Sequence, residues 1–278
     1  RDVERSRGLG DVYKRQSQDL NKMTANRRLL RTEALLGKAG IEKLQNSTVM
    51  IVGLGAVGGY ALEALARSGI GHLILVDFDV IEETNVNRQI LAVGSTIGML
   101  KTEAARVRVR EINPDCRVEI LNLFVNSGTI PELLSHRADI VIDAIDALNP
   151  KCCLMEELYR RDIPFISSMG AALKTDPAKI HYGKLSDTKN CSLSRFIRKR
   201  LKKRGIDISR IACVFSDEQN CLNEGAIFQD EETVNTEISA GRQGRVRNTL
   251  GSMPTITAIF GLTIANQVCL LYTSPSPR

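Results

Sequence analysis

The sequence predicts an α/β fold: a doubly wound, mostly parallel sheet with a C-terminal antiparallel extension. Short apolar runs rich in β-branched residues alternate with segments of helical periodicity from residue 47 onward. The first run, Val49–Val52, ends in a glycine-rich turn, and a helical pattern begins at Ala61. A second run, His72–Val76, ends in Asp77, which follows the last glycine of the turn by 19 residues. Strand, turn, helix and strand in this order are typical of a parallel sheet with helices on both faces.

The later elements continue this alternation and give a Rossmann-like order. Further strands are expected at residues 117–123, 138–142, 163–167 and 179–184. Helices are expected at residues 61–68, 100–111, 130–136, 150–161, 193–201 and 253–265, with one or two short ones before residue 47. Pro114 ends the helix 100–111, whereas Pro254 lies in the first turn of the last helix, where a missing N–H costs nothing.

The two ends of the chain are set aside before its composition is considered. Residues 6–16 and 269–278 can be back-translated into DNA that is reverse-complementary over nearly the whole of both stretches. Such complementarity is typical of adapter read-through, so residues 1–16 and 269–278 are excluded from the fold. Residues 17–268 are expected to form a single domain, with a nucleotide-binding core at 47–170 and a substrate-side extension at 171–268.

Charge and cysteine content restrict the class of protein. The formal net charge of +6 falls to +3 without the two excluded ends, so the total charge identifies no partner. Six of the seven cysteines lie in residues 17–268 and form no Cys-x-x-Cys pair, which favours reduced thiols in a cytoplasmic protein and indicates no zinc site. No apolar run is long enough to suggest a membrane span. Cys213 is expected to be a small core residue, whereas a chemical role for Cys221 stays open.

The glycine-rich turn has the spacing of a phosphate-binding loop. Gly53 permits the tight turn, Gly55 lets the backbone approach a phosphate, and Gly58 lets the following helix pack closely on the strand. The unpaired N–H groups of the first helical turn then face the anion. Asp77 stands where a ribose-binding carboxylate is expected. The turn alone does not separate sites for NAD, FAD and nucleoside triphosphates.

The polar stretch Asp77–Gln89 favours a triphosphate. It supplies the carboxylate of Asp79 and the side chains of Asn85, Asn87 and Arg88, and Lys101 follows at the start of a helix. Cations grouped behind a phosphate-binding turn can neutralise charge during attack at the α-phosphate. A polar surface loop with a capping role is the alternative interpretation.

A second acidic group follows the apolar strand 138–142. Asp143 and Asp146 stand at the carboxyl end of this strand, where open α/β sheets bind their ligands. Asp146 is the better candidate for Mg²⁺, because carboxylates beside nucleotide phosphates commonly bind the bridging ion. Asp143 is expected to be structural.

Three stretches together resemble the adenylation core of the ubiquitin-activating-enzyme superfamily: Val49–Gly58, Leu75–Gln89 with Lys101, and Val141–Asp146. Within that superfamily, Arg31–Gly37, Gly170–Pro177 and Pro254–Asn266 are similar to the branch of dehydratases that act on threonylcarbamoyladenosine in tRNA. This resemblance implies an ATP-dependent enzyme in which MgATP adenylates the threonyl carboxylate and ring closure expels AMP. It also implies a single adenylation domain and a homodimer.

The resemblance assigns roles to individual residues. It assigns the phosphates to Gly53, Gly55, Gly58, Asn85, Arg88 and Lys101, the ribose to Asp77, and Mg²⁺ to Asp146, with Arg88, Lys101 and Asp146 as the catalytic set. Two features depart from the sulfur-carrier activators: Ala147 stands where they often have Asn, and their paired zinc cysteines are missing. The missing zinc cysteines favour the tRNA branch without excluding other members. Activation of the C-terminal Gly-Gly of a ubiquitin-like sulfur-carrier protein remains the alternative.

The extension carries candidate contacts to a partner. Arg195–Arg204 is a basic amphipathic helix, either a solvated face or a contact to the phosphates of tRNA. Asp217–Glu237 is acidic and expected to be a mobile loop, and Gly241–Gly251 adds flexible arginines. The apolar segment Met253–Ala265 is a candidate dimer face. Near the start of the chain, Arg27, Arg28 and Arg31 are expected to be solvated, unless Arg31 reaches the phosphate site of a partner subunit.

Overall fold

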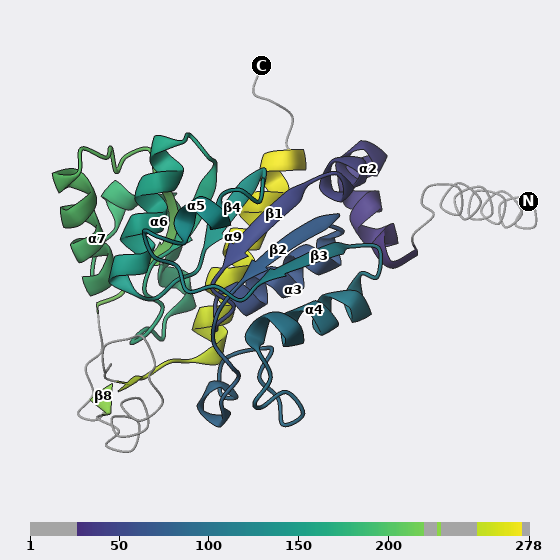
Figure 1. Ribbon diagram of the computed structural model, residues 1–278, viewed down its shortest axis with the longest axis horizontal. Coiled ribbons are helices and arrows are strands. Elements are labelled where there is room, and N and C mark those ends of the chain that lie inside the picture. The colour runs from purple at the N-terminus through teal and green to yellow at the C-terminus, as the bar shows by residue number, and fades with distance from the viewer. Residues whose placement is uncertain (1–26, 220–226, 229–248, 274–278) are drawn as a thin grey trace, which may run out of the picture.

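The computed structural model describes residues 27–219, 227–228 and 249–273 (Figure 1). At its centre lies a seven-stranded sheet with the order β3-β2-β1-β4-β5-β7-β6. The strands are β1 (Thr48–Val52), β2 (His72–Val76), β3 (Arg117–Leu121), β4 (Ile140–Asp143), β5 (Phe165–Ser168), β6 (Ile180–Lys184) and β7 (Ala212–Ser216). All neighbours pair in parallel except β6 and β7, which are antiparallel. The predicted parallel sheet with an antiparallel extension is confirmed.

The chain changes direction across the sheet at β1. β2 and β3 follow on one side of β1, and β4 and β5 continue on the other, so the switch lies between β1 and β4. Ligands of open α/β sheets bind at the carboxyl ends of the strands beside such a switch. The helices are α2 (Leu30–Gln45), α3 (Gly58–Ser68), α4 (Lys101–Ile112), α5 (Ile130–Leu133), α6 (Leu148–Arg160), α7 (Ser192–Lys203) and α9 (Pro254–Thr273). Short 3-10 turns, among them η1 (Arg27–Leu29) and η2 (Glu83–Asn85), and a two-stranded ribbon of β8 (Ile227–Phe228) and β9 (Thr249–Leu250) complete the described chain.

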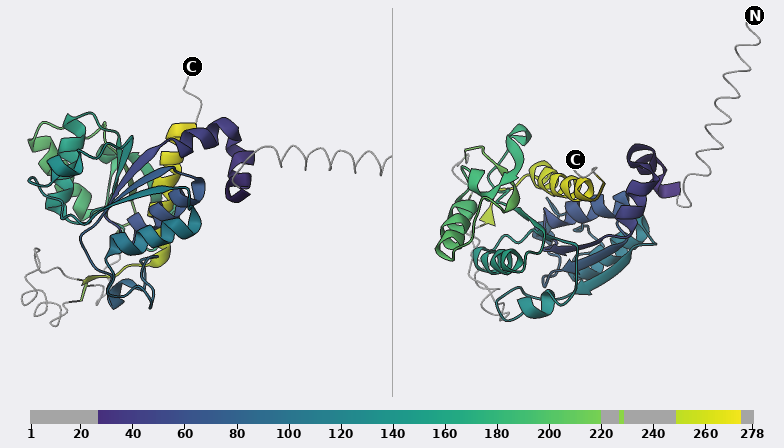
Figure 2. Two further views of the ribbon diagram at one scale, coloured as in Figure 1. Left: turned by 45° about the vertical axis from the view of Figure 1, so that its right-hand side comes forward. Right: turned by 90° about the horizontal axis from the view of Figure 1, so that it is seen from above.

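Helices cover both faces of the sheet, as the view from above in Figure 2 shows. Alternate residues of β1 enter different cores: Val49 and Ile51 pack with residues of α3, α4 and α9, whereas Met50 and Val52 pack with residues of α5 and α6. This two-sided burial is the reason that the central strands read as continuous apolar runs. A third cluster joins α6, α7 and β7 at the far end of the sheet.

Helix α9 is a packing helix of the main core. Its residues Ile256, Phe260 and Ile264 are fully buried, and it packs chiefly against α3. Gly261 permits the close approach, because a Cβ there would lie 2.4 Å from the carbonyl oxygen of Val57. The helix is also long and apolar enough to meet a length and composition test for a membrane span, contrary to the sequence expectation. Its buried face is that of a core helix.

The sequence located most elements to within three residues. It missed β7, which forms the antiparallel pair with β6. The lead-in segment, for which one or two short helices were expected, forms α2 with a kink at Gly37, whose φ of 75° and ψ of 166° are not helical. Helix α9 continues to Thr273, past the predicted end of the domain at residue 268, and that boundary stays a prediction. Residues 1–16, Cys221, and most of the segments 217–237 and 241–251 lie outside the described residues.

Candidate nucleotide-binding site

The glycine-rich turn joins β1 to α3. A side chain would not fit at two of its three glycine positions. A Cβ on Gly58 would lie 1.8 Å from the carbonyl oxygen of Gly53, and Gly53 itself has a φ of 93°. A Cβ on Gly55 would meet only Nε2 of Gln89, at 4.0 Å. Gly53 and Gly58 are therefore required by the fold, whereas the space beside Gly55 is open, and its predicted contact to a phosphate stays a prediction.

Asp77 connects the turn to the end of β2. Its Oδ2 accepts the N–H of Leu54 at 2.7 Å, and its Oδ1 accepts the N–H of Asp79 at 2.9 Å. Burial raises the pKa of Asp77, while the charge of Lys101 and the two backbone hydrogen bonds oppose the shift. Besides its predicted contact to a ribose, this carboxylate therefore has a structural role, since it orients the backbone of the glycine turn.

Lys101 extends the same network to α4. Its Nζ lies 2.9 Å from Oδ2 of Asp79, and its backbone N–H donates to the carbonyl oxygen of Asp79 at 3.0 Å. Lys101 is the first residue of α4 and is buried. The structure thus brings together three of the predicted charged residues, Asp77, Asp79 and Lys101, beside the N-termini of α3 and α4. Both helix N-termini favour anions.

The polar side chains of the loop after β2 have different hydrogen-bond partners. Asn85 is buried and its Oδ1 accepts the N–H of Glu82 at 3.2 Å, so its amide helps to cap η2. The guanidinium of Arg88 donates to the carbonyl oxygen of Thr84 and to Oδ1 of Asn87, both at 2.9 Å. Asn85 and Arg88 thus make contacts inside their own loop, and their predicted contacts to phosphate stay predictions.

Gln89 is a site residue that sequence reasoning missed. It is buried, its Nε2 faces Gly55, and its Oε1 has no hydrogen-bond partner among the described residues. A buried amide oxygen without a partner is costly, so a group that donates to it here would be favoured. The sequence signal was its place directly after Arg88 at the end of the polar stretch.

The acidic turn after β4 lies against the glycine turn. The N–H of Ala144 donates to the carbonyl oxygen of Val52 at 2.9 Å, and a Cβ on Gly53 would lie 2.9 Å from the carbonyl oxygen of Ala144. Asp143 is fully buried and pairs with Lys151, whereas Asp146 is exposed on the turn. The structural role expected for Asp143 agrees with this placement, and Asp146 is the carboxylate that a ligand at this edge can reach.

Cys213 has no access to a substrate. It lies fully buried in β7, and burial raises the pKa of its thiol to about 12. A thiol with such a pKa is not a nucleophile near neutral pH. The expectation that Cys213 is a small core residue therefore agrees with the structure, and Cys221 lies outside the described residues.

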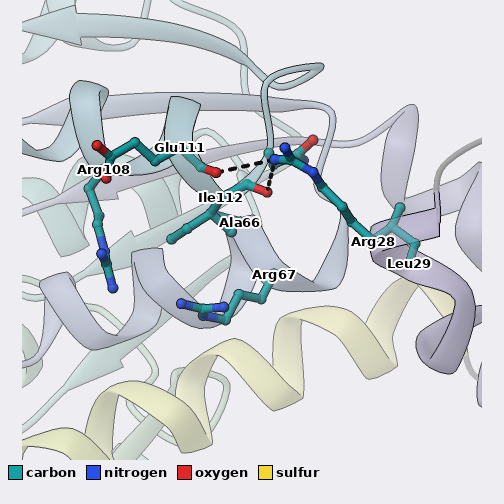
Figure 3. Close-up of a pocket in the computed structure, with 8 residues that line it drawn as sticks. Arg28, Leu29, Ala66, Arg67, Arg108, Glu111 and Ile112 are labelled. Carbon is teal, nitrogen blue, oxygen red and sulfur yellow. Dashed lines mark hydrogen bonds between the residues drawn. The ribbon is translucent and has the colours of Figure 1, made fainter.

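A separate cavity of about 480 Å³ lies at the other ends of α3 and α4 (Figure 3). Arg28 is exposed, as expected, and it also donates there to the carbonyl oxygens of Glu111 and Ile112, at 3.2 and 2.9 Å. Arginine at a helix C-terminus satisfies unpaired carbonyls and opposes the negative end of the helix dipole. Because the cavity lies at the C-terminal ends of α3 and α4, it is remote from the glycine turn. Arg28 links η1 to α4.

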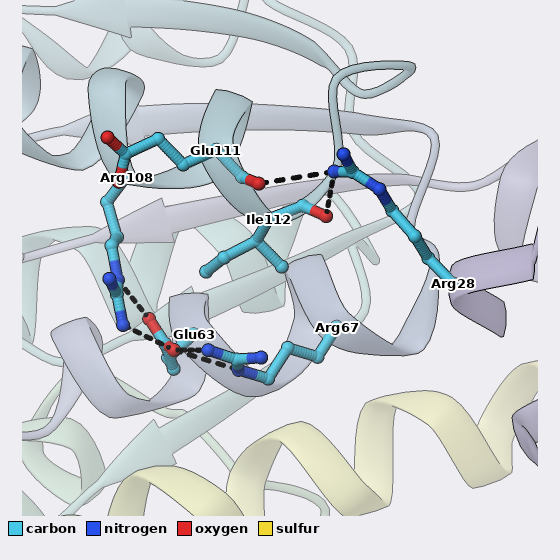
Figure 4. Close-up of polar contacts among 6 residues, drawn as sticks. All are labelled: Arg28, Glu63, Arg67, Arg108, Glu111 and Ile112. Carbon is cyan, nitrogen blue, oxygen red and sulfur yellow. Dashed lines mark hydrogen bonds and ion pairs between the residues drawn. The ribbon is translucent and has the colours of Figure 1, made fainter.

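The neighbouring arginines of that cavity share one buried carboxylate (Figure 4). Glu63 accepts from Nε of Arg108 at 2.9 Å and from Nε of Arg67 at 2.8 Å. Burial alone would raise the pKa of Glu63, but the hydrogen bonds and charges of Arg108 and Arg67 lower it below its usual value. The cluster ties α3 to α4. Arg31, by contrast, is exposed on α2.

A glycine turn at a helix N-terminus, beside a strand switch and two acidic strand ends, defines an α/β nucleotide-binding domain. The ThiF family model matches residues 26–275, and the chain belongs to the ThiF family. The superfamily resemblance expected from the sequence motifs is thereby confirmed.

Two curated relatives are similar over most of their length. The chain is 45% identical to "tRNA threonylcarbamoyladenosine dehydratase" of Bacillus subtilis, over 68% of this chain and 74% of the relative. It is 33% identical to the protein of the same name from Escherichia coli, over 83% of this chain and 87% of the relative. A solved structure of the Escherichia coli protein in complex with ATP is similar with a TM-score of 0.78 and 30% identity, covering 90% of this chain and 96% of that chain.

Alanine at Gly55 and at Gly58 should separate binding from folding. Gly55→Ala should leave the free energy of unfolding within about 0.5 kcal/mol of wild type, because the added Cβ meets no close neighbour. It should weaken ATP binding at least about tenfold, since the backbone can no longer approach a phosphate. Gly58→Ala should lose about 1–3 kcal/mol of stability through its clash with Gly53.

Urea unfolding and titration calorimetry with ATP measure these effects. Gly94→Ala is the matched control, because a Cβ at Gly94 has no neighbour within 4 Å. Wild-type ATP affinity in Gly55→Ala would show that the phosphates do not approach this turn.

Proposed function

We propose that this chain is an ATP-dependent enzyme that cyclises threonylcarbamoyladenosine in tRNA by adenylating its threonyl carboxylate. The observation that supports this most is the edge of the sheet at which Gln89 faces Gly55, Lys101 pairs with Asp79, and the turn before Asp146 packs on Gly53. Relatives that bear the dehydratase name cover most of the chain, and one of them has been solved with ATP. We propose a cytoplasmic location for the same reason.

The proposed reaction has two steps. A carboxylate oxygen of the substrate attacks the α-phosphorus of ATP, the bond to pyrophosphate breaks, and an acyl adenylate forms. A nucleophilic atom of the same modified side chain then attacks the activated carbonyl, and AMP leaves with the carboxylate oxygen that bonded it. The modified base loses the elements of one water molecule, and ATP becomes AMP and pyrophosphate.

The residues of this chain bind the nucleotide and neutralise the charge of its phosphates. Backbone N–H groups of the turn at Gly55 and of the first turn of α3 face the phosphates, and Asp77 accepts from the ribose. Lys101 and Arg88 oppose the charge that develops on the phosphates during attack. Arg88 must exchange its contacts to Thr84 and Asn87 for this purpose, so its loop adjusts when the nucleotide binds.

Mg²⁺ fits the donors at this edge. The described residues contain no group of three or more His, Cys, Asp or Glu side chains placed to hold a metal ion. Magnesium beside a nucleotide needs only one or two carboxylates, because phosphate oxygens and water complete its shell. Asp146, exposed on the turn after β4, would hold it. The ion would supply positive charge to the phosphates.

The basic helix α7 is the proposed contact to tRNA, through one of its faces. Arg198, Arg200 and Arg204 bond to Thr188, Asn149 and Glu156 of the same chain. Within α7, the exposed cations with no side-chain hydrogen bond or ion pair to another described residue are Arg195, Lys199, Lys202 and Lys203. This set lies at helical spacing and forms one stripe, which we call the lysine stripe. A phosphate backbone is neutralised by such a stripe.

We also propose that the protein is a homodimer. The residues Ile256, Phe260 and Ile264 of α9 are already buried within the chain, so a partner would meet exposed positions such as Leu262. Sedimentation should give a dimer at micromolar concentration, and Leu262→Asp should shift it toward monomer. Wild type that sediments as a monomer would contradict the dimer.

Arg88→Ala should lower the rate of adenylation about 100-fold or more, because it removes one cation from the developing charge. The measurement is pyrophosphate release on adding tRNA to enzyme and MgATP. Arg110→Ala is the control, since Arg110 is exposed in the last turn of α4. Equal rates in both variants would mean that the Arg88 loop does not serve the nucleotide.

Reversing the lysine stripe should weaken tRNA binding and flatten its dependence on salt. Four phosphate contacts cost roughly two orders of magnitude in affinity between 50 and 200 mM salt. Replacing Lys199, Lys202 and Lys203 by Glu should remove most of that slope, whereas Lys43→Glu with Arg110→Glu, on other exposed surfaces, should keep it. Binding is measured by filter retention over a salt series. An unchanged slope in the triple variant would place the tRNA elsewhere.

The activity itself is tested on tRNA that carries threonylcarbamoyladenosine. After incubation with enzyme and MgATP, mass spectrometry of the nucleosides should show the loss of one water from that nucleoside, with one AMP formed per conversion. No mass change, together with transfer of AMP to a small protein ending in Gly-Gly, would favour the sulfur-carrier alternative. A molybdopterin-synthase adenylyltransferase of Haemophilus influenzae is 35% identical over 49% of this chain, which supports that alternative only weakly.

A further inference from the structure

Lys151 is a fully buried cation beside the candidate site, and none of the roles described above uses it. It lies in the first turns of α6 and has no exposed surface. Its Nζ lies 2.8 Å from Oδ2 of Asp143, 3.0 Å from the carbonyl oxygen of Ile145 and 3.3 Å from that of Asp143. An ammonium group has three N–H donors, and these three acceptors match them.

The partners of Lys151 belong to the turn that carries Asp146. Asp143 also accepts from Oγ of Ser167 in β5 at 2.8 Å and from the N–H of Ile145 at 3.2 Å. The carboxylate thus joins β4, β5, α6 and the turn itself. Because Lys151 bonds directly to the carbonyl of Ile145, its position defines the backbone immediately before Asp146.

The same turn supports the glycine turn. The carbonyl oxygen of Ala144 occupies the place where a side chain on Gly53 would lie, and the N–H of Ala144 donates to Val52. A movement of the turn would therefore move the backbone that faces the phosphates. The turn can neither collapse inward nor shift outward without loss of these contacts.

Stability alone does not account for a charge at this position. Replacing a buried ion pair by apolar side chains of similar size is often neutral or stabilising. We propose that Lys151 is a positioning residue of the nucleotide site, which holds the turn Asp143–Asp146 so that the Asp146 carboxylate can serve MgATP. The role of Asp146 in this inference rests on the proposed function. The contacts by which Lys151 holds the turn do not depend on that function.

The double variant Asp143→Asn/Lys151→Met tests the proposal. It removes both charges, so no unpaired charge stays buried, and Asn keeps acceptors and donors for Ile145 and Ser167. Lys151→Met alone leaves the Asp143 carboxylate buried without its cation, so this single variant reports mainly on folding. Lys43→Met, at an exposed position of α2, is the matched control for the lysine substitution.

Two measurements are made on folded protein. Hydrogen exchange at the N–H groups of Ala144 and Ile145 should become at least about tenfold faster in the double variant, because the turn loses its anchor. The gain in ATP affinity on adding Mg²⁺, measured by calorimetry, should fall about 10- to 100-fold, as is typical when a supporting residue behind a metal ligand is lost. Binding of ATP without Mg²⁺ should change much less.

The outcomes separate this proposal from the proposed function. A double variant with wild-type exchange and a wild-type effect of Mg²⁺ would overturn the role of Lys151, because the pair would then be structural only. If the wild-type protein shows no affinity for ATP, the proposed function fails, and faster exchange in the double variant still supports Lys151 as the residue that holds the turn.

Discussion

Two backbone turns meet at the carboxyl end of β1 with no space for a side chain between them. Gly58 packs on the carbonyl of Gly53, and Gly53 packs on the carbonyl of Ala144. Because these contacts are backbone to backbone, they fix where the first turn of α3 begins and where its unpaired N–H groups point. The proposed phosphate contacts of the glycine turn and of the first turn of α3 depend on this close approach.

Charged side chains hold this arrangement from two sides. Asp77 accepts two backbone N–H groups and orients the glycine turn from β2, while the buried pair of Asp143 and Lys151 anchors the acidic turn from α6. Both carboxylates are buried and both are fully hydrogen-bonded, as buried charges must be. Asp146, in contrast, is exposed on the acidic turn. Rigid backbone with a few accessible charges suits a site that stabilises developing charge.

The local parts of the site were predictable from the sequence, and the long-range parts were not. The glycine spacing, Asp77 and the alternating strands have periodic or short-range signals, and the structure contains each of them. Lys151 escaped notice because its meaning depends on Asp143 eight positions away and on burial that no spacing reveals. The basic helix looked uniform in sequence, yet the partners of Arg200 and Arg204 come from α6, about fifty residues away in the chain. β7 was missed because an apolar run of five residues is too short for its periodicity to distinguish a strand from a buried helical segment.

The central claim is that a substrate carboxylate attacks the α-phosphorus of ATP at this edge of the sheet. The most direct test uses tRNA in which both oxygens of the threonyl carboxylate are a heavy isotope, followed by one turnover with MgATP and mass spectrometry of the nucleotide products. The account predicts one labelled oxygen in AMP and none in pyrophosphate, because AMP leaves with the oxygen that attacked phosphorus. Label in inorganic phosphate with formation of ADP, or unlabelled AMP, would contradict it.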